Sequence, residues 1–203
     1  RGFIDIVGKV RERFPDLEIC LTTNGVLLEP YLDLLHELGV RKINISLDSL
    51  NRQRYHLITG RDVLPKVLAA IESALKIGSF NIKLNAVLFR ETLSELDELL
   101  QYAASRDVVF RFIERMPFLP ENDGQRFVSG DELLEELKKF GAVERDQVSD
   151  TTVALMYRLS LKGGNNVKVG IIPPMTHKFC ARCDRLRLTC DGHLKTCLYS
   201  GKE

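Results

Sequence analysis

The sequence predicts an α/β fold in which helices connect the strands of a curved, open, parallel sheet. Strand patterns alternate with helical patterns through the first half of the 203-residue chain, an order typical of parallel sheets with helical crossovers. Two of those strands carry polar residues at every second position, although strands of parallel sheets are usually apolar on both faces. We therefore expect one concave face of the sheet to hold a polar ligand.

The individual elements follow from apolar spacing and from Gly and Pro breaks. Helical spacing predicts helices over residues 2–14, 30–38, 51–58, 64–77, 94–105 and 130–140. Runs of strand-forming residues predict strands over residues 18–22, 42–47, 81–89, 108–114, 153–161 and 167–172. The segment 163–166, Gly-Gly-Asn-Asn, predicts a hairpin turn between the last two strands.

The regular alternation of strand and helix patterns ends near Pro117, where a polar loop over 117–127 begins. We predict two regions, residues 1–117 with the parallel strands and residues 118–203 as a β-rich extension. Four parallel strands do not close a barrel, so we expect the chain to be a fragment that lacks both ends.

Composition excludes several classes of protein. Lys and Arg number 29 against 28 Asp and Glu, so no overall charge favours nucleic acid or an anionic membrane. No apolar run approaches the ~20 residues that a membrane helix needs, and no signal peptide opens the sequence. Five cysteines without an export signal favour metal or cluster binding over disulfides, and we interpret Cys20 as an inert core residue.

The polar positions of the sheet lie on one side and at strand ends. Asn44, Ser46 and Asp48 alternate with apolar residues, as do Lys83 and Asn85 on the next strand. A buried ammonium is costly without an anionic partner, so Lys83 is expected to face a cavity that binds an anion. The strand-end segments 22–25, 46–48 and 114–116 lie at the edge where α/β sheets bind ligands. The alternative is that these polar groups only cap helices and turns, and that Met116 belongs to the core.

The most specific pattern is the cysteine segment near the carboxyl terminus. Cys180 and Cys183 form a C-x2-C pair, and the turn at Asp191-Gly192 is expected to fold Cys197 back towards that pair. Three converging thiols favour either a [4Fe–4S] cluster with one open iron or a zinc site, and incidental thiols remain a third interpretation. For zinc, the fourth ligand would come from Cys190, His177 or His193.

Arg185 and Arg187 share one face of the strand beside these cysteines. Their planar guanidinium groups suit phosphate oxygens, and an anionic nucleotide fits an arginine pair next to an open iron. The alternative is an exposed ion pair with Asp184 or Asp191, which contributes about 1 kcal/mol at most.

Five motifs resemble one family in sequence and in order. They are Leu21-Thr22-Thr23-Asn24-Gly25, Asn44-Ile45-Ser46-Leu47-Asp48-Ser49-Leu50, Lys83-Leu84-Asn85, Arg111-Phe112-Ile113-Glu114-Arg115-Met116-Pro117, and the segment from Cys180 to Cys197. Over essentially the whole chain they are similar to the GTP 3′,8-cyclase family of radical SAM enzymes, which begins molybdenum-cofactor biosynthesis.

The resemblance implies a partial radical-SAM (βα)6 open barrel with a carboxyl-terminal, β-rich, cluster-binding extension. In that family a first [4Fe–4S] cluster cleaves S-adenosylmethionine to a 5′-deoxyadenosyl radical, which removes a hydrogen from C3′ of GTP so that this carbon adds to C8. A second cluster binds the guanine at its open iron, and the product passes to cyclic pyranopterin monophosphate synthase. Matching motifs imply three sets of site residues: cluster ligands Cys180, Cys183 and Cys197; GTP contacts Thr22, Lys83, Arg111, Arg185, Leu186 and Arg187; S-adenosylmethionine contacts Ser46 and Met116.

Two departures from the family pattern limit this expectation. The three-cysteine motif for the first cluster and the family's glycine-ended tail are not in this sequence, so this chain alone is expected to be inactive. A smaller departure is Asp184, which stands where the family usually has Asn. The remaining alternatives are another radical SAM enzyme with an accessory cluster and a zinc-stabilised α/β binding module. A cytoplasmic location (the mitochondrial matrix in a eukaryote) and a homodimer complete the expectations.

Overall fold

The computed structural model describes residues 2–116, 127–147 and 153–198. These residues form a seven-stranded sheet in the order β1-β2-β3-β4-β7-β6-β5 and a separate sheet of β8 and β9. Most of the loop predicted over 117–127 lies outside the described residues.

The predicted parallel strands are confirmed. The strands β1 (Cys20–Thr23), β2 (Lys42–Ser46), β3 (Asn81–Leu88) and β4 (Val109–Glu114) pair in parallel in chain order. Beyond β4 the sheet continues with β7 (Asn166–Ile172), which is parallel to β4, and then with the antiparallel β6 (Leu155–Leu161) and β5 (Gly141–Arg145).

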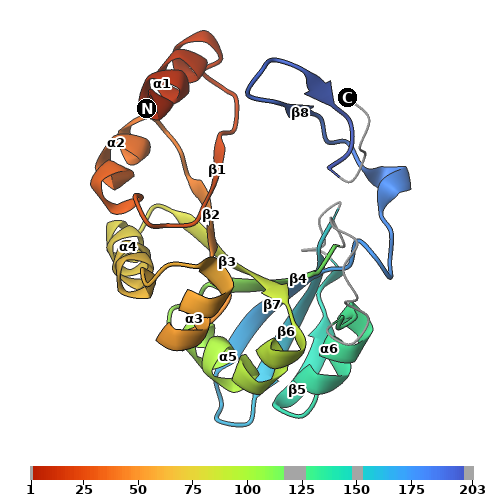
Figure 1. The fold of residues 1–203 in the computed structure, drawn as a ribbon. Helices are drawn as coiled ribbons and strands as arrows, with labels where there is room; N and C mark the ends of the chain where they lie inside the picture. The colour runs from red at the N-terminus through yellow and green to blue at the C-terminus, as the bar shows by residue number, and fades with distance from the viewer. Residues whose placement is uncertain (1, 117–126, 148–152, 199–203) are drawn as a thin grey trace.

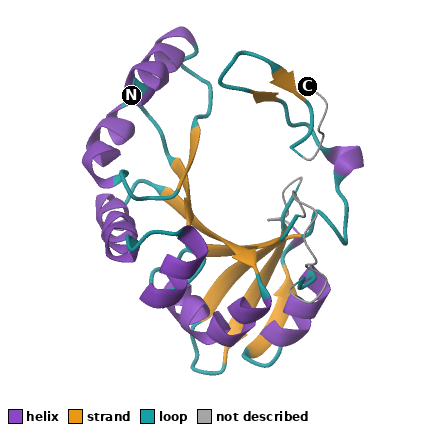
Figure 2. Ribbon diagram, in the orientation of Figure 1, coloured by secondary structure: helices purple, strands orange, loops and turns teal. Residues whose placement is uncertain are grey.

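Helices cover the convex side of this sheet, and Figures 1 and 2 show them around its outside. They are α1 (Phe3–Arg13), α2 (Leu32–Glu37), α3 (Arg52–Thr59), α4 (Leu64–Ile77), α5 (Leu96–Ala104) and α6 (Gly130–Leu137). Shorter 3-10 helices are η1 (Glu29–Tyr31), η2 (Arg90–Glu95) and η5 (Cys180–Arg182). Among the described helices, none is long and apolar enough to cross a bilayer.

Alternation along the strands separates the core from the concave face. Ile45, Leu84 and Phe110 are fully buried under the helices, whereas the positions between such residues are partly exposed. The hairpin of β8 (Arg187–Leu188) and β9 (Leu194–Lys195) lies on the helix-free side of the sheet, across from α1 (Figure 1). The concave face of the sheet is thus turned towards the hairpin (Figure 1).

Two details of the carboxyl-terminal half differ from the prediction. The helix predicted over 130–140 ends at Leu137, and the unpredicted strand β5 follows, because 141–145 is a short and partly charged edge strand with little apolar signal. A second detail, which the sequence did not indicate, is that the strands after residue 153 continue the sheet of the first half. The division at residue 117 stays a prediction.

Candidate functional site

A continuous polar network lies on the concave face of the parallel strands. The pairing register sets Thr22 beside Asn44 and Asn85 beside Arg111. Arg111 donates from Nε to Asn85 Oδ1 at 2.8 Å and from Nη2 to Asn44 Oδ1 at 2.5 Å. The amide of Asn44 in turn donates to Thr22 Oγ1 at 3.2 Å and to Cys20 Sγ at 3.3 Å. The prediction that Asn44, Lys83 and Asn85 share this face is confirmed.

The thiol of Cys20 belongs to this network, and its assignment to the core was wrong. Cys20 is exposed and lies on the same face as Thr22, two positions along β1. The period-two rule that identified the other polar positions predicts this placement. Its sulfur accepts a hydrogen bond from Asn44, so Cys20 lines the site.

Positive charges gather on this face, where Lys42 at the start of β2 pairs with Glu18. Burial lowers the pKa of Lys83, and the nearby Arg111 and Lys42 lower it further. Burial also lowers the pKa of Arg111, and Arg185 acts in the same direction. Among the residues that the structure describes, no ion pair joins Lys83, Arg111 or Arg185 to a carboxylate. Arg185 of the cysteine segment therefore lies close enough to Arg111 to lower the pKa of its guanidinium.

The other predicted contacts occupy the edge of this face. Ser46 ends β2 and pairs with Asn85, and Met116 follows the end of β4; both are partly buried. Just beyond β2, Asp48 accepts a hydrogen bond from the backbone N–H of Val87 at 2.8 Å. Burial raises the pKa of Asp48, while that bond opposes the shift. The loop after β2 is therefore fastened to β3 next to Ser46.

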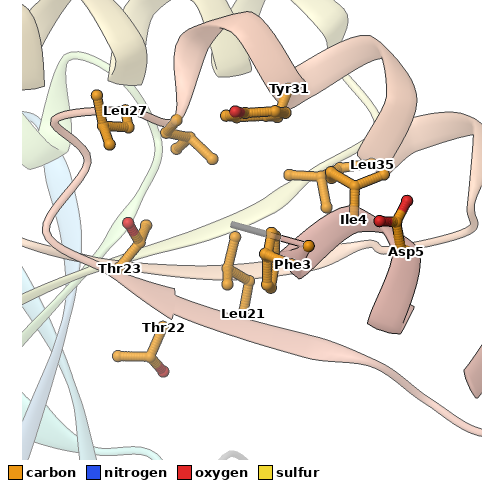
Figure 3. Close-up of a pocket in the computed structure, with 11 residues that line it drawn as sticks. Phe3, Ile4, Asp5, Leu21, Thr22, Thr23, Leu27, Tyr31 and Leu35 are labelled. Atoms are coloured by element: carbon orange, nitrogen blue, oxygen red, sulfur yellow. The ribbon is translucent and has the colours of Figure 1, made fainter. Parts of the chain in front are cut away.

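An apolar pocket with a volume of about 480 Å³ lies between α1, β1 and α2. Phe3, Leu27 and Tyr31 contribute to its lining, and Figure 3 shows Thr22 on the opposite side of β1 from Leu21 and Thr23. The bulk of this pocket is thus separated by β1 from the cationic network.

The cysteine segment has the predicted local structure without a complete ligand set. Cys180 and Cys183 flank the turn η5, where the N–H of Cys183 donates to the carbonyl of Cys180 at 3.2 Å. In the hairpin, Arg187 pairs with Lys195 and Leu188 with Leu194, and Cys197 follows two residues after the end of β9. Cys190 lies in the turn at the other end of the hairpin.

The predicted convergence of Cys180, Cys183 and Cys197 is not observed. Among the described residues, no three His, Cys, Asp or Glu side chains lie close enough to hold a metal ion. All three thiols are free and exposed. Thiolate–metal bonds supply the energy that holds such side chains in one coordination sphere, so the donor chemistry fits a cluster although the side chains do not converge. The ligand assignment stays a prediction.

The histidines considered as fourth ligands have other partners. His177 Nε2 lies 2.9 Å from both carboxylate oxygens of Asp131, and His193 Nδ1 lies 3.1 Å from Asp191 Oδ2. Within the described part of the chain, neither Arg185 nor Arg187 forms the ion pair with Asp184 or Asp191 that was the alternative for them. Leu186, predicted to contact GTP, is 67% exposed on the other face of that segment.

Glu114, at the end of β4, is a site residue whose contacts the sequence did not indicate. It is 1% exposed and accepts hydrogen bonds from the backbone N–H groups of Gly130 (2.7 Å), Met175 (2.9 Å) and Thr176 (3.0 Å), and from the Thr176 hydroxyl. It therefore fastens the loop after β7 to the end of β4.

Two family profiles together match nearly the whole chain. Residues 1–103 match the radical SAM superfamily, and residues 108–203 match the family described as Molybdenum Cofactor Synthesis C.

Similar curated proteins carry one name. The chain is 38% identical to a GTP 3′,8-cyclase of Rhodococcus opacus over 95% of its own length and 55% of that protein. It is 40% identical to a GTP 3′,8-cyclase of Peptoclostridium acidaminophilum over 98% of its length and 62% of that protein. The chain thus spans a little over half the length of the curated relatives it matches.

Solved structures agree with the fold. The structure described as native anSMEcpe with bound AdoMet aligns with a TM-score of 0.54 and 21% identity over 68% of this chain and 40% of that one. The match between the superfamily profile and residues 1–103, which hold three of the parallel strands, gives the assignment: the chain belongs to the radical SAM superfamily.

Proposed function

We propose that the full-length protein to which this sequence belongs cyclises GTP to (8S)-3′,8-cyclo-7,8-dihydroguanosine 5′-triphosphate, the first step of molybdenum-cofactor biosynthesis. The observation that carries the proposal is that Lys83 and Arg111 lie on the concave face and form no described ion pair with a carboxylate. Lys83 and Arg111 are held there at a desolvation cost, which an anionic ligand offsets. Relatives named GTP 3′,8-cyclase supply the identity of that anion.

The proposed role of each residue follows from its position in the site. Arg185 and Arg187 present planar donors that suit phosphate oxygens, while Lys83 provides a point charge from the sheet. Asn44 and Asn85 accept hydrogen bonds from Arg111 and so fix the direction of its guanidinium. Thr22 completes the row on β1, where its hydroxyl accepts from Asn44. Ligand binding thus requires the sheet and the cysteine segment together.

We propose that Ser46 and Met116, at the edge of the site, contact S-adenosylmethionine. Cys180, Cys183 and Cys197 would hold a second [4Fe–4S] cluster, and Leu186 would contact GTP beside the two arginines. When bound, S-adenosylmethionine and the clusters supply the radical chemistry of the reaction. Retention of the second cluster would depend on these three thiols, which are exposed and free. The downstream synthase, a homodimer and a cytoplasmic or mitochondrial-matrix location belong to the same proposal.

The test is GTP binding by the full-length protein, purified without oxygen and loaded with both clusters. Arg187→Ala should weaken GTP binding by about 1.5–3 kcal/mol, as expected for a charged hydrogen-bond partner. Iron content and cleavage of S-adenosylmethionine without GTP should stay normal.

Arg52→Ala is the matched control, because it removes an equal charge that is paired with Asp62 on the protein surface. GTP affinity that is unchanged in Arg187→Ala, with both clusters intact, would refute the assignment of the arginine pair. Stoichiometric zinc, in place of iron and sulfide, would favour the binding module instead.

A further inference from the structure

Glu114 joins three segments that are distant in the sequence. Its oxygens accept from Gly130 at the start of α6, 16 residues away, and from Met175 and Thr176 in the loop after β7, 61 and 62 residues away. Every described partner is a donor, so an ionised carboxylate satisfies them all. A buried carboxylate with this many donors holds its neighbours in one arrangement.

The start of α6 packs closely against the end of β7, next to the junction formed by Glu114 and its hydrogen-bond donors. A Cβ at Gly130 would lie 2.8 Å from Ile171 Cγ2, so only glycine lets the helix approach the end of β7 this closely. The imidazole of His177 then lies 2.9 Å from the carboxylate of Asp131, in the first turn of α6. The backbone N–H of His177 donates to the carbonyl of Pro173 at 3.1 Å. The loop 173–177 is therefore fixed to α6 and β4 immediately before the cysteine segment begins.

The cysteine segment has few other described attachments to the main sheet. Phe179 packs against the small buried cluster of Val153, Ala154 and Met156. After that residue, β8 and β9 pair only with each other among the described strands. The position of Arg185 relative to Arg111 is thus set largely by the junction at Glu114, which lies on the opposite face of β4 from Arg111.

We propose that Glu114 is a positioning residue: by fixing the loop 173–176, it sets the placement of the arginine pair over Lys83 and Arg111. This inference rests on the proposed function, because the ligand that reports the placement is GTP. Glu114 itself is buried on the helix-covered side and does not face the ligand. Its effect passes through the segment that it holds.

The experiment uses Glu114→Gln in the full-length protein with both clusters loaded. The substitution keeps the shape but turns an NH2 group towards backbone donors, so the loop should shift. We expect GTP affinity to fall by about tenfold, in line with the loss of charged hydrogen bonds. The Michaelis constant for S-adenosylmethionine and the iron content should not change.

A double-mutant cycle separates positioning from general loss of structure. In an Arg187→Ala background, Glu114→Gln should reduce GTP affinity clearly less than it does alone, since part of the group that it positions is already gone. Additive effects would overturn the proposal. So would a parallel loss of S-adenosylmethionine binding, because that result indicates damage to the whole barrel.

Two further variants complete the design. Ser129→Ala removes the N-cap of α6, where Ser129 Oγ accepts from the N–H of Glu132, and should leave GTP affinity unchanged because this cap does not touch the loop. If Glu114→Gln does not fold, Thr176→Val removes one donor from the same junction and must weaken GTP binding. Wild-type protein that does not bind GTP refutes the proposed function; unaffected Glu114→Gln and Thr176→Val variants refute only the role of Glu114.

Discussion

Gly170 is the residue whose substitution tests the concave site most directly. It lies on β7 directly beside Arg111 of β4. A Cβ at this position would lie 2.7 Å from Arg111 Cγ and 3.1 Å from Met156 Sδ. Glycine inside a strand often marks such a close approach, and here it leaves room beside β7 for the stem of Arg111, whose guanidinium extends away from β7 to Asn85 of β3 and Asn44 of β2.

The expected size of the effect follows from these distances. Carbon atoms in ordinary contact are about 3.5–4.0 Å apart, so Gly170→Ala must move the stem of Arg111 by roughly 1 Å. Because the new Cβ presses from the β7 side, this displacement pushes the stem towards β3, and the bonds from Arg111 to Asn85 and Asn44, now 2.8 and 2.5 Å, lose their present geometry. A charged hydrogen bond contributes about 1.5–3 kcal/mol, which corresponds to roughly 10- to 100-fold in GTP affinity.

Equilibrium GTP binding to the cluster-loaded, full-length protein is the assay. Gly163→Ala in the turn of the same hairpin is the control, because a Cβ there meets nothing within 4 Å. In an Arg111→Ala background, Gly170→Ala should have little further effect. If Gly170→Ala alone binds GTP as tightly as the wild type, then the direction of the Arg111 guanidinium does not matter for the ligand, and the reasoning fails.

Two other substitutions test the charge and the ligands of the site. Lys83→Met should weaken GTP binding at least tenfold, yet raise the thermal stability of the ligand-free protein. The reason is that burial lowers the folded-state pKa of Lys83 below its unfolded-state value. The charged amine therefore destabilises the fold fully below the folded-state pKa, and the penalty declines as the pH rises from that pKa to the unfolded-state value. An unchanged or lower melting temperature at neutral pH would contradict this. Cys197→Ser should remove the iron and sulfide of the second cluster, whereas Cys190→Ser should retain both, and equal loss in the two variants would favour a different ligand set.

The parallel half of the fold could be predicted because its signals are local. Each strand–helix unit carries its own apolar period, and short connections leave few alternatives for the order of the strands. The polar face was also readable, since Asn44 and Lys83 interrupt strands that would otherwise be apolar on both sides. The same period identifies Cys20 as a residue of the concave face once it is applied to β1.

Contacts between segments that are distant in the sequence could not be predicted from local patterns. The turn at 163–166 indicates that β6 and β7 pair with each other, but nothing in their sequence states that β7 also pairs with β4. The partners of Glu114 are equally hidden, because they are backbone N–H groups, which every residue except proline possesses. The spacing of apolar residues places Glu114 at the end of its strand, but it does not indicate which groups donate hydrogen bonds to its carboxylate.

Electrostatics explains why the site was nevertheless recognisable in a nearly neutral chain. Some described carboxylates pair with cations on the outer surface, as Asp62 does with Arg52 of α3, and Glu18 pairs with Lys42 at the start of β2 on the concave face itself. Lys83 and Arg111 form no ion pair with a carboxylate among the described residues, and their burial adds a desolvation cost that lowers the pKa of each. A fold keeps an arrangement of this kind when a bound anion offsets the cost, so the unpaired charge itself indicates the chemistry of the ligand. The shape of that ligand depends on how the cysteine segment is held over the face, which is why the junction at Glu114 matters as much as the cations.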